Sequence, residues 1–109
     1  MKPVAWLGDS LERVRAFPDA PKHGVGYQLE RVQAGKEPAD WKPMPSVGLG
    51  VNEIRVREGG AFRVICVAKF PEAVYVLHAF QKKARKTPKT EIDVARDRYR
   101  AMVNERKQR

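Results

Sequence analysis

The alternation of apolar and polar positions is clearest in the middle of the chain. In NEIRVR, Ile54 and Val56 alternate with charged residues, which predicts a strand with one buried and one charged face. The run AFRVICVAK is apolar at both odd and even positions apart from Arg63 and Lys69, as expected of a strand at the centre of a sheet with both faces buried. AVYVLHAF is rich in β-branched and aromatic residues and predicts a third strand. The turn sequences EGG and FPE separate these three strands.

Helical spacing occurs before this region. The segment from Ser10 to Phe17 carries an apolar stripe at helical spacing, and Pro18 follows it as a helix breaker. A second helix is predicted over residues 21–32, because Val25, Leu29 and Val32 recur at intervals of four and three. Both segments are therefore expected to bury one face each against the sheet.

A third helix is predicted at the C-terminal end. Thr87 is expected to cap it and Pro88 to occupy its first position. Its apolar face would consist of Ile92, Ala95, Tyr99, Met102 and Val103.

The remaining segments complete the predicted architecture. Residues 3–7 are apolar and aromatic and indicate a first strand, whereas residues 36–50 hold three prolines and two glycines and indicate an ordered loop. The order β-α-α-β-β-β-α predicts an α+β fold for a single domain over residues 1–109. We expect an antiparallel sheet of about four strands, with two N-terminal helices and one C-terminal helix.

Composition narrows the partner class. The chain has 22 Lys and Arg against 13 Asp and Glu, a formal charge of +9 that attracts polyanions such as nucleic acid. No stretch approaches the roughly 20 apolar residues that a membrane span needs, and the N-terminus lacks the continuous apolar run of a signal peptide. We therefore expect a cytoplasmic protein without a membrane partner. Cys66 is the single cysteine and lies in an apolar run, which favours a core position.

Most of the positive charge lies near the C-terminus. Residues 82–109 contain 11 Lys and Arg and 4 Asp and Glu, a net +7 of the total +9. If the three central strands pair in sequence order, Arg55, Arg57 and Arg63 lie beside this region, and several phosphates could be bound at once. The alternatives are a solvated surface run or a docking site for a protein partner. The basic residues that follow the last strand are Lys82, Lys83, Arg85, Lys86 and Lys89.

Arg63 and His78 stand out as single polar residues in apolar strands. An unpaired guanidinium is costly to bury, so Arg63 must reach solvent, a carboxylate or a ligand phosphate; pairing with Glu53 or Glu58 is the alternative to phosphate binding. The ordinary pKa of His suits His78 to proton transfer near neutrality, although a lone His in a strand is more often structural. The two His and one Cys show no metal-ligand spacing, and no cofactor is expected.

These residues occur in a pattern that resembles a known family. The segment from the EIR strand through FRV, LHAFQKK, KTP and the EIDVA helix is similar to the phage-derived Gp49-like and HigB-like branch of the RelE/ParE toxin superfamily. The resemblance covers residues 50–104 strongly. It implies a RelE-like microbial RNase fold and a type II toxin that cuts mRNA, commonly on the ribosome. A cognate antitoxin, expected to be a helix-turn-helix protein, would hold it inactive.

The resemblance also implies roles for individual residues. Arg63 matches the family's strand arginine and would stabilise the phosphorane, while Arg55 would bind the scissile or an adjacent phosphate. Lys82 or Lys83 would act as acid or charge stabiliser, and His78 would be the proton carrier. Cleavage would be independent of metal.

The chain departs from the ribosome-dependent archetype at two points. Glu53 stands where the archetype has a strand lysine, and residues 87–92 lack the tyrosine that begins the last helix there. The ParE branch shares the fold but inhibits DNA gyrase, so a non-catalytic gyrase inhibitor and an inactive prophage-derived binding module remain alternatives.

Overall fold

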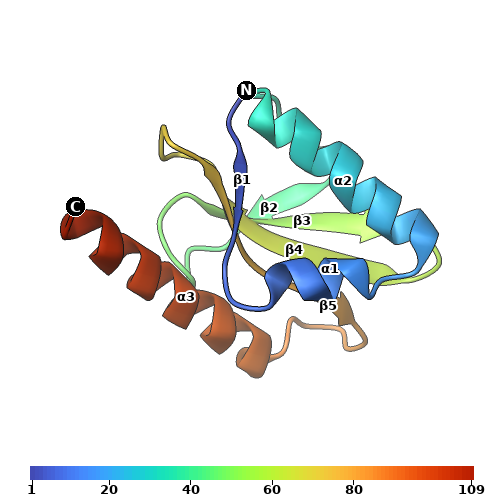
Figure 1. Ribbon diagram of the computed structural model, residues 1–109. Coiled ribbons are helices and arrows are strands. Elements are labelled where there is room, and N and C mark those ends of the chain that lie inside the picture. Colours follow the sequence, from blue (N-terminus) through green and yellow to red (C-terminus); the bar gives the residue numbers. More distant parts are fainter.

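Three antiparallel strands form the centre of the protein, and one further strand extends the sheet at each edge. The computed structural model describes residues 1–109, and the strand order is β1-β5-β4-β3-β2 (Figure 1). In chain order the elements are β1 (Val4–Trp6), α1 (Ser10–Arg15), α2 (Asp19–Gln33), β2 (Trp41–Pro43), β3 (Val51–Arg57), β4 (Ala61–Val67), β5 (Val74–Lys82) and α3 (Lys89–Lys107).

The α+β class is confirmed, but the predicted four-stranded antiparallel sheet is wrong in two respects. The sheet has five strands, because β2 forms inside the segment predicted as a loop and pairs with β3. The sheet is also mixed, because β1 pairs in parallel with β5. A three-residue strand that ends in a proline shows no period in the sequence, and the direction of β1 depends on a partner about 70 residues further along the chain.

The predicted helices exist, with shifted ends. The first ends at Arg15, two residues earlier than expected, and the second already begins at Asp19, directly after Pro18. The third begins at Lys89 with Pro88 in the capping position. Thr87 does not cap this helix, because its hydroxyl donates a hydrogen bond to the Glu53 carboxylate instead.

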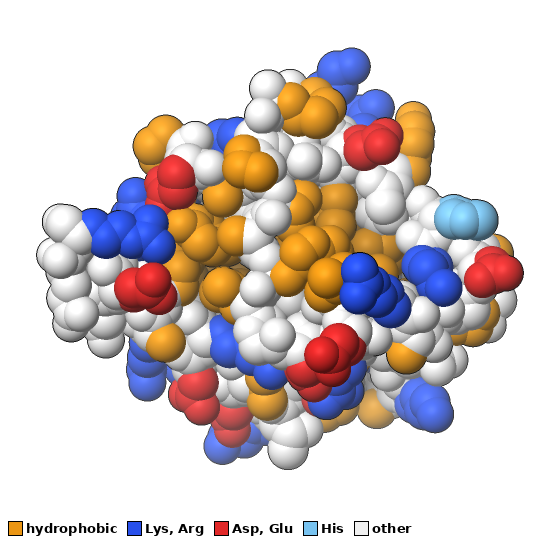
Figure 2. Space-filling model, viewed as in Figure 1, with side chains coloured by type: hydrophobic (Ala, Val, Ile, Leu, Met, Phe, Trp, Pro, Cys, Tyr) orange, Lys and Arg blue, Asp and Glu red, His pale blue; other side chains and the backbone are white.

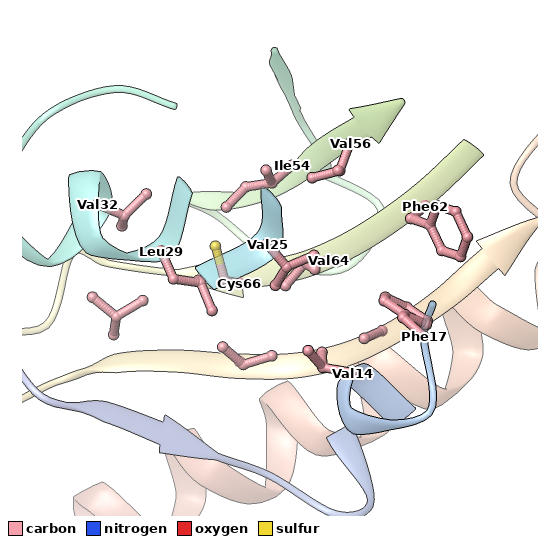
Figure 3. Close-up of a cluster of buried hydrophobic side chains, with 13 residues drawn as sticks. Val14, Phe17, Val25, Leu29, Val32, Ile54, Val56, Phe62, Val64 and Cys66 are labelled. Atoms are coloured by element: carbon pink, nitrogen blue, oxygen red, sulfur yellow. The ribbon is translucent and has the colours of Figure 1, made fainter. Parts of the chain in front are cut away.

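Two apolar cores lie on opposite faces of the sheet. The α2-side core joins α1 and α2 to the sheet through side chains such as Val25, Leu29 and Val64, and Phe17 packs on Phe62 with ring centroids 4.8 Å apart (Figure 3). Cys66 is buried in this core, as predicted, and burial raises the pKa of its thiol to about 12. The α3-side core packs α3 against the other face through Ala95, Met102, Ile65, Leu77 and Phe80.

A bulge in β5 decides which face His78 occupies. The register with β4 passes from Ile65–His78 to Cys66–Val76, so Leu77 has no partner opposite it. Leu77 packs in the α3-side core, and His78, the next residue, also contacts α3. Strict alternation would place His78 on the α2 side, so the extra residue redirects its side chain.

The outer surface on the α2 side is partly apolar. Figure 2 shows apolar side chains gathered between β1 and α2, with charged side chains around them. A pocket of about 780 Å³ opens at the end of α2 and is lined by residues such as Pro3, Val32, Trp41 and Cys66. None of the three helices combines the length and the apolar character that a membrane crossing requires.

The α3-side core generates a stability prediction. Leu77→Ala removes a fully buried side chain and should lower the free energy of unfolding by about 2–5 kcal/mol, because a cavity remains. Leu49→Ala truncates a largely exposed leucine and should change it by less than about 0.5 kcal/mol. Urea denaturation of both variants checks this, and equal losses would contradict the assigned core.

Candidate nucleic-acid interface

Cationic side chains from three adjacent strands lie on the sheet face that α3 partly covers. Arg55 of β3 pairs in register with Arg63 of β4, and Arg57 lies opposite Ala61, which itself pairs with Lys82 of β5. Side chains of residues paired across antiparallel strands point to the same face. The structure thus brings together Arg55, Arg57, Arg63 and Lys82, which we call the cationic face.

The sequence did not indicate Lys42, a fifth cation on this face. Lys42 lies on β2 opposite Glu53, and its charge helps to lower the pKa of Lys82. It was missed because β2 was predicted as a loop, and a strand of three residues offers only the single Trp41–Lys42 alternation as a signal.

The lysine at the end of β5 has an unusual environment. Desolvation, and then the positive charge of Arg63, lower the pKa of Lys82 below that of an ordinary lysine. Its ammonium therefore releases a proton more readily than a solvated lysine does, which brings it closer to the range useful for general acid–base chemistry.

Arg63 lies beneath the surface of the cationic face. It is only 4% exposed, its Nε is 3.5 Å from Glu53 Oε1, and its Nη1 donates a hydrogen bond to the Phe62 carbonyl. Desolvation lowers the pKa of its guanidinium. Of the sequence alternatives, pairing with Glu53 is therefore the one observed, and Glu58 does not contribute.

The outer arginines are more accessible. The side chains of Arg55 and Arg57 are 24% and 65% exposed, and each lies within 3.7 Å of an Asp40 carboxylate oxygen. These contacts are longer than hydrogen bonds, so Asp40 orients the two guanidiniums without occupying their donors.

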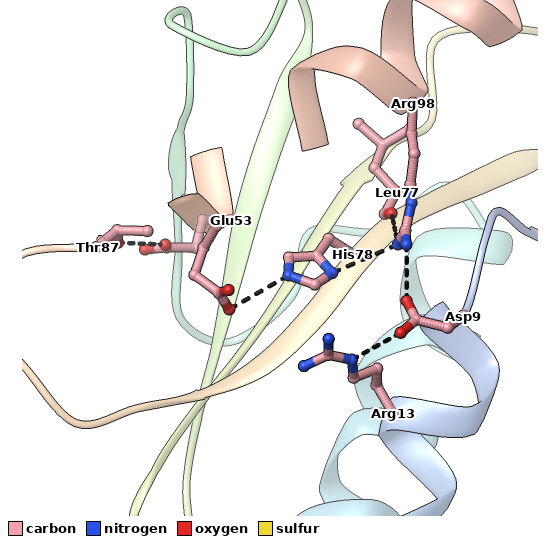
Figure 4. Close-up of polar contacts among 8 residues, drawn as sticks. Asp9, Arg13, Glu53, Leu77, His78, Thr87 and Arg98 are labelled. Carbon is pink, nitrogen blue, oxygen red and sulfur yellow. Dashed lines mark hydrogen bonds and ion pairs between the residues drawn. The ribbon is translucent and has the colours of Figure 1, made fainter. Parts of the chain in front are cut away.

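The basic loop after β5 leads from the cationic face to α3. Lys83, Arg85 and Lys86 are exposed and make no ion pair, whereas Lys89 pairs with Asp93 on the first turns of α3. The far end of the loop is fixed to the sheet by the hydrogen bond from the Thr87 hydroxyl to Glu53 Oε2, 3.0 Å long (Figure 4). The loop backbone is thus anchored beside the cationic face.

His78 is enclosed under α3 and is 1% exposed. Its Nε2 lies 3.2 Å from Glu91 Oε2, and its Nδ1 lies 3.4 Å from Arg98 Nη1 (Figure 4). Because a guanidinium can only donate, Nδ1 accepts and the proton resides on Nε2. Desolvation lowers the pKa of His78 despite the neighbouring carboxylate. In this conformation its ring nitrogens are both occupied within the fold.

The same arginine ties α3 to the N-terminal turn. Arg98 donates hydrogen bonds to the Leu77 carbonyl and to Asp9, and Asp9 also accepts from Arg13 of α1. Gly8 has a φ of 55°, and a Cβ there would collide with the Arg98 guanidinium, so this close approach requires glycine. The network fixes α3, and with it one border of the cationic face.

The pocket on the α2 side contains no comparable set of charges, and no group of three or more His, Cys, Asp or Glu side chains is arranged to hold a metal. The chemistry that the structure offers is therefore concentrated on the cationic face.

The enclosure of His78 predicts its protonation state. At pH 6.5, where a free imidazole is half protonated, the His78 ring should be mainly neutral, because burial disfavours its charged form. Ring 15N chemical shifts should identify Nε2 as the protonated atom. A ring that is mainly charged at this pH would contradict the placement.

The Asp9 network predicts a pH dependence of stability. Hydrogen bonds from Arg13 and Arg98 lower the pKa of Asp9 to about 2. The stabilisation that ionised Asp9 gives to the fold is therefore fully present above the ordinary carboxyl pKa of 3.8 and is lost as the pH falls towards 2. Asp9→Asn should therefore destabilise the protein near neutrality, and its difference from wild type should narrow between pH 4 and about 2. Urea titrations over this range measure the difference, and Asp97→Asn, at an exposed carboxylate that makes no ion pair, is the control for the change in net charge.

Comparison with known proteins identifies the family. The family described as "Phage derived protein Gp49-like (DUF891)" matches residues 12–100, which include β3 to β5 and most of α3. No curated protein matches the chain. The match spans more than three quarters of the sequence, and the chain therefore belongs to the phage-derived Gp49-like family, within the RelE/ParE-like toxin superfamily.

Proposed function

We propose that this chain is the toxin of a type II toxin–antitoxin system, of the HigB-like kind, and that it cleaves mRNA on the ribosome without a metal. The observation that carries the proposal is the cationic face, where three adjacent strands supply four positive side chains. The lowered pKa of Lys82 on the same face supports catalysis beyond simple binding.

Metal-free RNA cleavage needs charge stabilisation and proton transfer at one phosphate. The 2′-hydroxyl gives its proton to a base or to water as its oxygen attacks phosphorus, and the phosphorane gains negative charge. The bond from phosphorus to the 5′-oxygen then breaks, and the 5′-oxygen leaves with a proton from a general acid. Arg55 and Arg57 are accessible enough to hold phosphates, and Arg63 adds a fixed positive charge beneath them. Lys82, with Lys83 beside it, is the candidate donor of the proton to the leaving oxygen.

The remaining predicted residues receive supporting roles. Lys83, Arg85, Lys86 and Lys89 would contact neighbouring phosphates of the mRNA or the ribosome, since such contacts add affinity without sequence preference. His78 would reach RNA only if α3 moved, so we assign the proton transfer to lysine. A cognate antitoxin, expected to be a helix-turn-helix protein, would bind the toxin and prevent its activity in the cytoplasm.

One observation favours a second candidate. Arg63 and His78, the two residues most directly linked to catalysis by the sequence, are both buried and paired within the fold. A non-catalytic protein that uses its charged surface to inhibit DNA gyrase needs neither residue to be accessible.

Induced expression separates these functions. Wild type should arrest growth and translation, and both Lys82→Ala and Arg63→Lys should relieve the arrest. The first removes a positive charge beside the reacting phosphate, and the second keeps the charge but loses the planar guanidinium that Glu53 and the Phe62 carbonyl hold in place. Arg15→Ala removes an exposed arginine of α1 and should leave toxicity unchanged. Growth arrest with intact mRNA and loss of DNA supercoiling would favour the gyrase inhibitor.

A purified system tests the chemistry. The protein should cleave mRNA on translating ribosomes in the presence of EDTA, and Lys82→Ala should lower the rate by about 100-fold or more, as loss of a general acid does. Primer extension locates and quantifies the cleavage. Full activity of Lys82→Ala would remove this lysine from the mechanism.

A further inference from the structure

A buried carboxylate lies in the middle of the cationic face. Glu53 is 0% exposed, and its Oε1 is 3.5 Å from Arg63 Nε and 3.6 Å from Arg55 Nε. These three atoms are buried, and none of them makes a hydrogen bond. The second oxygen, Oε2, accepts the hydrogen bond from Thr87. One carboxylate thus joins β3, β4 and the loop that leads to α3.

Each of the two guanidiniums has an Nε edge, which faces Glu53, and a terminal edge, which does not. Glu53 faces the Nε edge of Arg55 and Arg63, at distances that provide attraction without a hydrogen bond. The Nη2 atoms of both guanidiniums donate no hydrogen bond within the protein. A phosphate can therefore approach the terminal nitrogens of Arg55, with the charge of Arg63 beneath it, while the carboxylate continues to hold the Nε edge of both guanidiniums.

The negative charge of Glu53 does not increase the affinity of the cationic face for RNA. A carboxylate among cations weakens their combined attraction for phosphate, and a carboxylate is costly to bury. Glu53 must therefore contribute in another way. Its contacts with Arg55, Arg63 and Thr87 indicate that it orients these side chains.

We propose that Glu53 is a positioning residue for the RNA-cleaving site: it fixes the guanidiniums of Arg55 and Arg63, and through Thr87 the basic loop, in the arrangement that the transition state requires. This inference rests on the proposed function. Glu53 acts through these neighbours, because it is fully buried and does not itself contact the substrate.

The proposal predicts a separation of kcat from KM. Glu53→Gln keeps the size of the side chain and its acceptor oxygen but removes the charge that orients two arginines. Its kcat should fall about 10- to 100-fold, as small misplacements of catalytic groups do, while KM for RNA should stay the same or decrease. Glu53→Asp, which keeps the charge, should recover part of kcat.

Glu58→Gln is the matched control. Glu58 is an exposed carboxylate at the β3–β4 turn that makes no ion pair, so this variant changes the net charge equally without touching Arg55 or Arg63. It should retain wild-type kcat. Steady-state cleavage of mRNA on ribosomes by the full chain gives both constants, and the shape of the pH–rate profile should be the same in all variants.

Several results would overturn the inference. Wild-type kcat in Glu53→Gln, or a raised KM with unchanged kcat, would show that Glu53 does not position the arginines for the reaction. Loss of the acidic limb of the pH profile only in Glu53→Gln would make Glu53 a base instead. Absence of cleavage by the wild type would refute the proposed function itself, which is a separate outcome.

A measurement on the resting protein does not require activity. The wild type should give two Arg Nε–H NMR signals that exchange slowly with water, because both atoms are buried. These signals should shift in Thr87→Val, which removes one contact of Glu53 and leaves its charge in place, and remain unchanged in Glu58→Gln. If Glu53→Gln does not fold, unchanged Arg signals together with unchanged kcat in Thr87→Val would still refute the proposal.

Discussion

The candidate site depends on the attraction between the Glu53 carboxylate and the Arg63 guanidinium, both removed from water on one face of the sheet. Burying either charged group alone would be strongly destabilising, because an isolated ion loses its hydration. The Glu53 carboxylate therefore allows the Arg63 guanidinium to remain buried at the centre of the sheet. The accessible Arg55 and Lys82 are arranged around this pair. Desolvation and the positive charge of Arg63 lower the pKa of Lys82, against the opposing effect of Glu53.

A second polar network fixes the helix that borders the site. Arg98 reaches from α3 to Asp9 at the N-terminal turn and to the bulged segment of β5. His78 lies between Arg98 and Glu91, and its neutral ring completes the contacts under the helix. The histidine that the sequence presents as a proton carrier thus serves, in this conformation, to hold α3 in place.

The Glu53–Arg63 pair and the Arg98 network together support the positively charged surface from below and at its border. The strands present Arg55, Arg57 and Lys82 at spacings fixed by the sheet register, and Thr87 attaches the adjoining basic loop to the same carboxylate. Pre-arranged charge of this kind is what a metal-free reaction at a phosphate demands, since no reorganisation is then needed as charge develops.

The sequence by itself determined the three central strands, the three helices and the gathering of Arg55, Arg57, Arg63 and Lys82, because local periodicity and strand order are enough to place them. Only the tertiary structure decided the existence of β2, the direction of β1 and the burial of Arg63. These features depend on partners far away in the chain. The bulge at Leu77 is the plainest case: one unpaired residue moves His78 to the other face of the sheet, and no local pattern records it.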